Sequence, residues 1–320
     1  MKINNNLNNF KNLNNNKINM YKLNSLNQNI LEKINNNIYN FNKLISKYKN
    51  ILFICGDYPG YGGAATNCDN LQKYYQSLGH QTFAFYYNFE KGKNARYEKN
   101  NNYWIDNLNE INNIKFKPDL IILKSFININ LKNIFNCPIY YLIGGIYKNE
   151  LDKYYYDINT FEEQEKYINK NVIEQIKNSD YSFVNSSHTQ EILEKYYNLK
   201  TYLFYSSFVS FINKKLEEDI NFKNRKYEYG LIVSNFNRTI KNVNDSIEFL
   251  KDKENVILIG KNSNKYKDYG FKCVDLVNKD EINHYYKQIK YIVQDSFYES
   301  CSNVKIESLF YGCKLKFFIN

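Results

Sequence analysis

Two glutamates near the C-terminus, Glu299 and Glu307, have the spacing of a ligand-binding pair. The apolar residues 291–293 favour a strand, and Ser300 or Ser302 can cap the helix that follows. The N–H groups at a helix start attract anions, and a carboxylate accepts hydrogen bonds from hydroxyl groups. A sugar nucleotide offers both kinds of group. We therefore expect Glu299 to face a sugar and Glu307, about two turns into the helix, to reach a ribose.

Two cations, Arg238 and Lys241, lie in a polar turn between an apolar run and a helical pattern. Val243, Ile247 and Leu250 fall on one helix face, which predicts a helix that starts just after Lys241. The cations would then lie where a diphosphate meets the N-terminus of a helix. The alternative for these cations and for the two glutamates is a purely structural one, in which they are solvated charges on a loop and a helix.

A third candidate is the glycine-rich turn that contains Gly62 and Gly63, between an apolar strand at 51–55 and a predicted helix that runs to about Leu78. Glycine allows backbone amides to approach a bound group closely. The spacing matches neither the dinucleotide-binding fingerprint nor the P-loop. A tight strand-to-helix turn without a ligand is therefore the alternative.

The order of these motifs resembles that of retaining GT-B glycosyltransferases, especially those of family 4. Glu-x7-Glu after a strand is similar to their donor-binding motif, and the resemblance covers most of residues 227–315. It implies transfer of a hexosyl group from a nucleotide sugar with retention of configuration, without a metal ion or another cofactor. It also implies that Arg238 and Lys241 hold the donor diphosphate. The implied catalytic residues are Arg238, Lys241 and Glu299, and the implied donor-binding residues are Gly62, Gly63, Lys241, Glu299, Ser300, Ser302, Asn303 and Glu307.

The chain departs from the family pattern in three places. The spacing of Arg238 and Lys241 is tighter than usual, and Gly144-Gly145 stands where many family members have a histidine. Related enzymes also continue beyond the predicted strand at 315–319, so we expect a second domain that is short or truncated. The missing histidine and the short second domain favour an alternative function, that of a catalytically inactive relative that binds a sugar nucleotide or a glycan.

Strand and helix patterns alternate along the chain, which predicts an α/β fold with parallel sheets covered on both faces. Residues 30–48 have helical periodicity and would either pack on a sheet or lie on a membrane surface. The expected organisation is two Rossmann-like domains, with an Asn/Lys-rich extension (1–48), an N-terminal acceptor-side domain (49–212), a linker (213–226) and a C-terminal nucleotide-sugar-binding domain (227–320).

The charge of the chain raises a third hypothesis, that of a basic nucleic-acid-binding protein. The 320 residues carry a net charge of +10 with a sequence pI of about 9.0. The lysines are spread along the chain instead of forming a basic stripe. A nucleotide sugar and an anionic membrane surface are therefore better partners than a specific nucleic acid. The acceptor, whether glycan, lipid or protein, stays open.

The six cysteines are scattered, and no Cys-x-x-Cys pair occurs. No apolar run is long enough to cross a bilayer. We therefore expect reduced thiols and a cytoplasmic location, with peripheral membrane association as the alternative.

Overall fold

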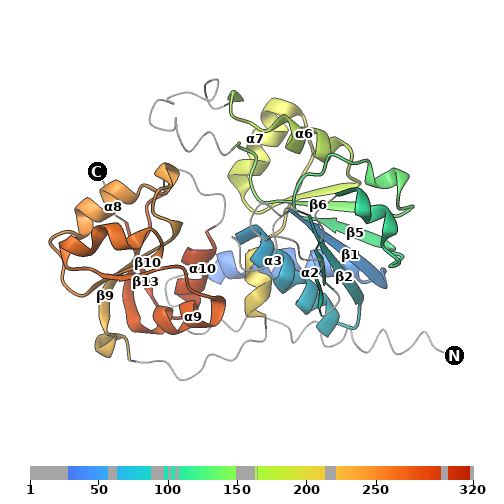
Figure 1. The fold of residues 1–320 in the computed structure, drawn as a ribbon. Helices are drawn as coiled ribbons and strands as arrows, with labels where there is room; N and C mark the ends of the chain where they lie inside the picture. The colour runs from blue at the N-terminus through green and yellow to red at the C-terminus, as the bar shows by residue number, and fades with distance from the viewer. Residues whose placement is uncertain are drawn as a thin grey trace. The chain divides into compact units, whose positions relative to one another are not determined.

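The computed structural model describes residues 28–56, 63–87, 97–99, 102–104, 108–148, 163, 165–212, 221–296 and 302–317. The chain folds into two units, each built around its own sheet (Figure 1). One unit contains the described residues of 29–146 and 169–213, and the other contains Gln28 and the described residues of 147–168 and 214–320. The predicted fold class, α/β with two Rossmann-like domains, is confirmed.

The first sheet has eight strands in the order β3-β4-β2-β1-β5-β6-β7-β8. All neighbours pair in parallel except β3 and β4, which pair antiparallel. The central strands are almost completely buried, because both faces are covered and the residues form continuous apolar runs. The strands are β1 (Asn50–Cys55), β2 (Gln81–Tyr86), β3 (Tyr97–Lys99), β4 (Asn102–Trp104), β5 (Leu120–Leu123), β6 (Ile139–Ile143), β7 (Tyr181–Val184) and β8 (Tyr202–Leu203).

Helices cover both faces of this sheet. The long helices are α2 (Gln28–Ile45), α3 (Gly63–Ser77), α6 (Lys170–Lys177) and α7 (Ser187–Tyr197). Short 3-10 helices lie at Leu108–Asn113 (η2), Leu131–Asn133 (η3) and Ser206–Phe211 (η5).

The structure shows whether helix α2 packs on a sheet or lies free for a membrane surface, which the sequence left open. Ile34, Ile38, Phe41 and Ile45 are buried on one face of the helix, and the ring of Phe41 stacks on Phe204 with centroids 3.8 Å apart. Phe41 also meets the edge of Phe183, on β7, at 4.8 Å, and the amide of Asn42 donates to the hydroxyl of Tyr74 on α3. The helix therefore packs on the first sheet beside α3 and does not present its apolar face to a membrane.

The second sheet has five parallel strands in the order β11-β10-β9-β12-β13. The strands are β9 (Tyr227–Asn235), β10 (Val256–Lys261), β11 (Lys272–Val274), β12 (Ile289–Val293) and β13 (Lys314–Lys316). The helices of this unit are η6 (Phe222–Asn224), η7 (Thr239–Lys241), α8 (Val243–Leu250), η8 (Ser263–Tyr269), α9 (Lys279–Gln288) and α10 (Asn303–Phe310).

The alternating side chains of β9 and β10 divide the core of this unit into two layers. Leu231 and Leu258 pack with Val243 and Ile247 of α8 on one face. On the other face, Ile232, Ile257 and Ile259 pack with Tyr286 of α9, and Val304 of α10 joins that layer. Helix α8 and helices α9 and α10 thus cover opposite faces, as the sequence predicts for a parallel sheet.

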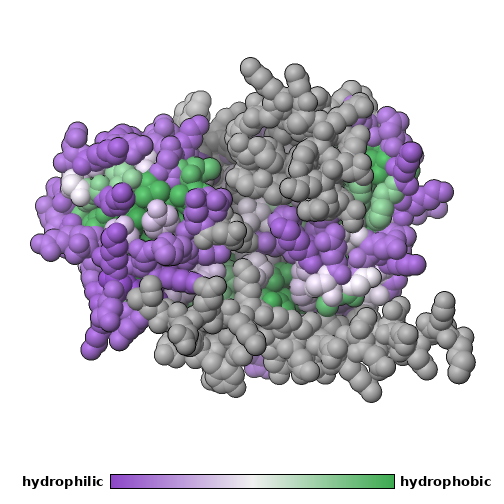
Figure 2. All heavy atoms as spheres, turned by 60° about the horizontal axis from the view of Figure 1, so that its bottom comes forward, coloured by the Kyte–Doolittle hydropathy of each residue, from purple (hydrophilic) through white to green (hydrophobic). Residues whose placement is uncertain are grey.

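Most of the described surface that Figure 2 shows is hydrophilic, with hydrophobic residues in small separate areas. Within the described residues, no helix is both long and apolar enough to cross a bilayer. None of the five described cysteines, Cys55, Cys68, Cys137, Cys273 and Cys313, takes part in a disulfide.

Candidate donor-binding site

Three loops of the second unit follow neighbouring parallel strands. The connections that begin at residues 236, 262 and 294 leave the carboxyl ends of β9, β10 and β12. Because β9 lies between β10 and β12, these loops emerge side by side at one edge of the sheet. Ligands of open parallel sheets bind at this edge, so the fold brings the β9–α8 loop and the start of α10 to the place where a ligand is expected.

The loop after β9 is fixed by a side chain at its start. The Oδ1 atom of Asn235 accepts from the N–H of Asn237 at 3.0 Å and from the side-chain amide of Asn262 at 2.9 Å. The first contact is an Asx turn, which lets the chain reverse without a regular hydrogen-bond ladder. The second joins the loop to the residue that follows β10. The β9–α8 loop is therefore anchored to its neighbour before any ligand is considered.

The two predicted cations flank a single 3-10 turn in this loop. Arg238 directly precedes η7 and Lys241 is its last residue, and the N–H of Lys241 donates to the carbonyl of Arg238 at 3.1 Å. Both residues are half-buried. Asn242 then adopts a left-handed conformation with φ 49°, and α8 begins at Val243. The predicted start of the helix just after Lys241 is confirmed.

A third cation, Lys265, contacts the same loop and was not among the predicted site residues. The ammonium group of Lys265, on η8, lies 3.2 Å from the carbonyl oxygen of Phe236 and 3.0 Å from Oδ1 of Asn237. Its position after β10 could have been used to find it, because every loop at this edge of the sheet is a candidate for ligand contact. Arg238, Lys241 and Lys265 thus all belong to the β9–α8 loop or contact it.

The residues after β12 include the cap of α10. The hydroxyl of Ser302 donates to Oε1 of Gln294 at 2.8 Å and accepts from the N–H of Lys305 at 3.3 Å, so Ser302 is the N-cap residue. Asn303 is the first residue of the helix, and within the described residues its buried Oδ1 atom has no hydrogen-bond partner. An unsatisfied buried acceptor at a helix start is a point at which a ligand hydroxyl can bind.

Glu307 lies in α10 and is held by a second helix. The hydroxyl of Tyr286, on α9, donates to Oε2 of Glu307 at 3.0 Å. Burial, and then the charge of Glu307, raises the pKa of the Tyr286 hydroxyl well above its usual range. Tyr286 therefore stays protonated near neutral pH and acts as the hydrogen-bond donor. Glu307 itself is half-buried.

Several predicted site residues lie outside the described residues. They are Gly62, in the glycine-rich turn, and Glu299 and Ser300, in the loop between β12 and α10. Gly63 is described, and it is the exposed first residue of α3 in the first unit.

The first unit has its own cluster of polar groups at the carboxyl edge of its sheet. Lys124 follows β5 and is only 4% exposed, and its ammonium group lies 3.4 Å from the hydroxyl of Ser206. The hydroxyl of Ser125 accepts from the N–H of Gly56 at 3.0 Å. Gly144 and Gly145 follow β6 and are exposed, and a Cβ atom at either position would meet no atom within 4 Å. Lack of space therefore does not explain the absence of a histidine here.

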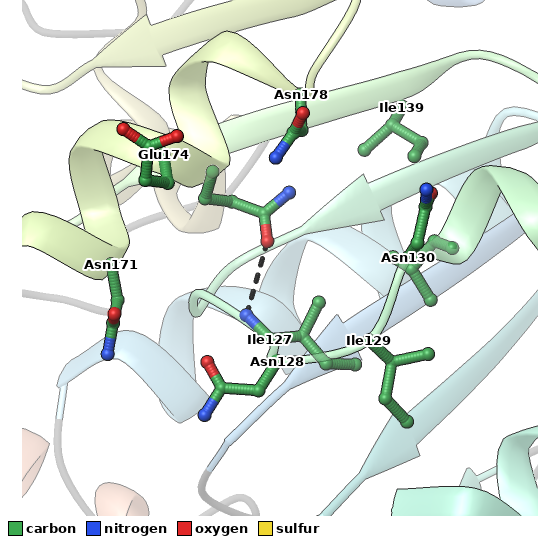
Figure 3. Close-up of a pocket in the computed structure, with 10 residues that line it drawn as sticks. Ile127, Asn128, Ile129, Asn130, Ile139, Asn171, Glu174 and Asn178 are labelled. Carbon is green, nitrogen blue, oxygen red and sulfur yellow. Dashed lines mark hydrogen bonds between the residues drawn. The ribbon is translucent and has the colours of Figure 1, made fainter.

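A pocket of about 240 Å³ lies between α6 and the connection from β5 to β6 (Figure 3). Its wall is rich in amides, and Oε1 of Gln175 accepts from the N–H of Ile127 at 3.2 Å across it. Asn130 caps η3, and Asn178 ends α6. The residues that line this pocket all belong to the first unit.

The described residues contain no group of three or more His, Cys, Asp or Glu side chains that could hold a metal ion. Arg238, Lys241 and Lys265 bring positive charge to the loop after β9.

Solved structures of known enzymes share this architecture. Sucrose-phosphate synthase from Thermosynechococcus elongatus aligns with a TM-score of 0.61 and 13% identity, over 84% of this chain and 81% of its own. An α-glucosyltransferase in complex with UDP and DNA containing an HMU base aligns with a TM-score of 0.55 and 11% identity, over 84% of this chain and 79% of its own. HepE from Anabaena, in complex with UDP and glucose, aligns with a TM-score of 0.53 and 14% identity, over 83% of this chain and 80% of its own.

No protein-family model matches the chain, and no curated protein has a significantly similar sequence. The structural likeness therefore rests on the arrangement of the two sheets and their helices. The chain has the GT-B fold, which it shares with these solved structures.

Proposed function

We propose that the chain is a retaining glycosyltransferase that moves a sugar from a nucleotide-sugar donor to an acceptor hydroxyl. The observation that carries the proposal is that three cations lie in or contact the loop after β9, and that helix α10, which carries Glu307, follows the neighbouring strand β12, in a chain with the GT-B fold. Such an arrangement can neutralise a diphosphate and accept hydrogen bonds from a ribose.

The proposed reaction breaks the bond between the anomeric carbon and the terminal phosphate oxygen of the donor. The acceptor oxygen forms a bond to that carbon, its proton is released, and the nucleoside diphosphate leaves with the bonding electron pair. Arg238 and Lys241 would neutralise the negative charge that grows on the diphosphate, and this electrostatic contribution is usually the largest in such a step. Glu299 would orient the sugar through its hydroxyls, and Glu307 would bind the ribose. Because the cations supply the positive charge, the proposal includes no metal ion.

The start of α10 supplies the remaining donor contacts. Ser302 caps the helix and Asn303 presents a buried acceptor there, so the sugar or the phosphate would lie against the first turn of α10 together with Ser300. Gly62 and Gly63, in the predicted glycine-rich turn, would also contact the donor. Uridine diphosphate sugars are the first donors to test, because two of the aligned structures contain UDP.

The acceptor is proposed only as a glycan, a lipid or a protein. The absence of disulfides among the described cysteines fits a cytoplasmic enzyme. Peripheral membrane contact through the excess positive charge would bring a lipid acceptor within reach.

A turnover assay tests the proposal. The release of UDP from UDP-glucose and UDP-galactose is measured for the unmodified chain, for Lys241→Ala and for Glu307→Ala. We expect turnover that both substitutions abolish, while the circular dichroism spectrum stays unchanged. The control is Lys253→Ala, which removes the same charge from an exposed lysine after α8, near the opposite edge of the sheet. Unchanged turnover in Lys241→Ala or Glu307→Ala would remove that residue from the site.

The second candidate function is a catalytically inactive relative that binds a sugar nucleotide or a glycan. The pair Gly144-Gly145, at a position where the resemblance implies a histidine, favours it. This candidate predicts donor binding without transfer or donor hydrolysis. Nucleic-acid binding is the third, and it predicts salt-sensitive binding to DNA or RNA that substitutions of Glu299 and Glu307 do not weaken.

A further inference from the structure

Tyr286 connects helix α9 to the carboxylate of Glu307, and its ring cannot move freely. The residue is completely buried, and its hydroxyl lies 3.0 Å from Oε2 of Glu307. The ring also stacks on Tyr311, with centroids 5.8 Å apart and an interplanar angle of 10°. A side chain that is packed on its faces and bonded at its tip has one orientation, so the phenol gives Glu307 a fixed donor.

The backbone of Tyr286 is fixed by a buried guanidinium group. Arg225 is only 5% exposed, and its Nη1 atom donates to the carbonyl of Ile289 at 2.8 Å and lies 3.5 Å from that of Tyr286. Its Nη2 atom donates to the carbonyl of Tyr311 at 2.8 Å, and the thiol of Cys313 donates to the carbonyl of Tyr286 at 3.1 Å. One arginine therefore joins the C-terminal ends of α9 and α10.

This arrangement places Tyr286 and Glu307 at a constant separation. The two helices that carry them share a single C-terminal clamp, and such clamps satisfy carbonyl groups that helix ends otherwise leave unpaired. A glutamate in a helix ordinarily has several rotamers and loses them when it binds a ligand. A partner that already restricts those rotamers lowers the entropic cost of binding.

We propose that Tyr286 is a positioning residue for recognition of the donor's ribose, which rests on the function proposed above. Its hydroxyl holds the carboxylate of Glu307 in the orientation that accepts from the hydroxyls of a ribonucleoside diphosphate. A carboxylate has about four acceptor positions, so it can accept from a phenol and from ribose hydroxyls together. The contribution of Tyr286 should therefore appear only with nucleotides that carry those hydroxyls.

The experiment compares nucleotides with and without the ribose hydroxyls. Isothermal titration calorimetry measures the Kd of UDP, GDP and ADP and of their 2′,3′-dideoxy forms for the unmodified chain, Tyr286→Phe and Tyr285→Phe. For the nucleotide that binds best, we expect Tyr286→Phe to raise the Kd of the ribose form about tenfold. The Kd of its dideoxy form should change less than about twofold.

Tyr285→Phe is the matched control, because it removes a phenol hydroxyl from the neighbouring position of the same helix, on a residue that is only half-buried. It should change neither Kd. Equal weakening of the ribose and dideoxy forms by Tyr286→Phe would show a general structural role and overturn the inference. Glu307→Gln is measured in the same way. If Glu307→Gln weakens binding of the ribose form while Tyr286→Phe leaves its Kd unchanged, the inference is also overturned.

The failure of the proposed function would look different. In that case none of the three nucleotides would bind the folded, unmodified chain. The inference about Tyr286 would then fall together with the function on which it rests.

Discussion

The ammonium group of Lys265 lies 3.0 Å from Oδ1 of Asn237, although 28 positions separate the two residues. This contact joins Lys265, on η8 after β10, to the loop after β9, which also contains Arg238 and Lys241. The candidate site, for which the sequence predicts two cations, therefore has a third cation in contact with its loop. The third comes from a different strand-to-helix connection.

We predict that Lys265→Ala weakens nucleotide-sugar binding, because a charge-assisted contact to a phosphate is lost. The expected rise in Kd is about tenfold, measured by calorimetry with the donor that binds best. Lys267→Ala is the control, since Lys267 is an exposed lysine on the same short helix. Full affinity in Lys265→Ala, together with weak binding in Lys241→Ala, would exclude Lys265 from the site.

A second prediction concerns the bend that ends β10. Gly260 has φ 140°, and a Cβ atom there would lie 1.7 Å from the carbonyl oxygen of Val233. Gly260→Ala would force β9 and β10 apart next to the candidate site, and we expect it to lower the free energy of unfolding by at least about 3 kcal/mol.

The matched control for this change is Gly270→Ala. Gly270 also has a positive φ, of 79°, but a Cβ atom there would meet nothing within 4 Å. Gly270→Ala should lower the free energy of unfolding by only about 1 to 2 kcal/mol, the ordinary strain of a left-handed residue with a side chain. Urea unfolding of both variants measures the difference. Equal losses of stability would show that the close approach to Val233 does not constrain the chain.

Helix α2 gives a third prediction, on the first unit. Phe41 is 2% exposed and stacks on Phe204, so Phe41→Ala should lower the free energy of unfolding by about 3 to 5 kcal/mol. Tyr39, on the same helix, is 48% exposed. Tyr39→Ala should therefore change the free energy of unfolding by less than about 0.5 kcal/mol. A small effect of Phe41→Ala, with Phe41-dependent binding to anionic vesicles, would instead assign this face to a membrane.

The sequence predicted most elements of both units because their apolar runs and helix faces are local patterns. The strands of the second unit, the helix after Lys241 and the Ser302 cap all follow from residues close together in the chain. Lys265, Tyr286 and Arg225 were missed for a common reason. Each acts through a partner between 21 and 86 positions away, and no local pattern records such a contact.

The sequence could not decide whether α2 packs on a sheet or lies on a membrane, because this choice also depends on distant residues. An amphipathic helix has the same periodicity whether its apolar face meets a sheet or a membrane. The choice depends on Phe183 and Phe204, far along the chain, which complete the surface that covers Phe41.

A fourth prediction concerns the pH dependence of stability. Burial lowers the pKa of His80, although a hydrogen bond with the carbonyl of Tyr48 and the charge of Asp119 act in the opposite direction. The unfolded chain therefore binds a proton at His80 at a higher pH than the folded chain does. Stability should fall as the pH drops below about 6.5, the ordinary pKa of histidine, towards the lower pKa of the folded state.

His80→Gln should reduce this loss. The measurement is the midpoint of thermal unfolding at about pH 7.5 and at pH values of about 5.5 to 6.5, because these values lie above and below the ordinary pKa of histidine. A pH dependence in His80→Gln equal to that of the unmodified chain would show that other groups cause the loss.

The central claim is that the carboxyl edge of the second sheet binds a nucleotide sugar. The most direct measurement is a thermal-shift panel of UDP-, GDP-, ADP- and dTDP-sugars with the unmodified chain, Lys241→Ala and Lys253→Ala, because a ligand that binds only the folded state raises its midpoint. We predict a rise with one nucleotide class that Lys241→Ala abolishes and Lys253→Ala retains. No rise with any donor, or an equal rise in Lys241→Ala, would contradict the claim.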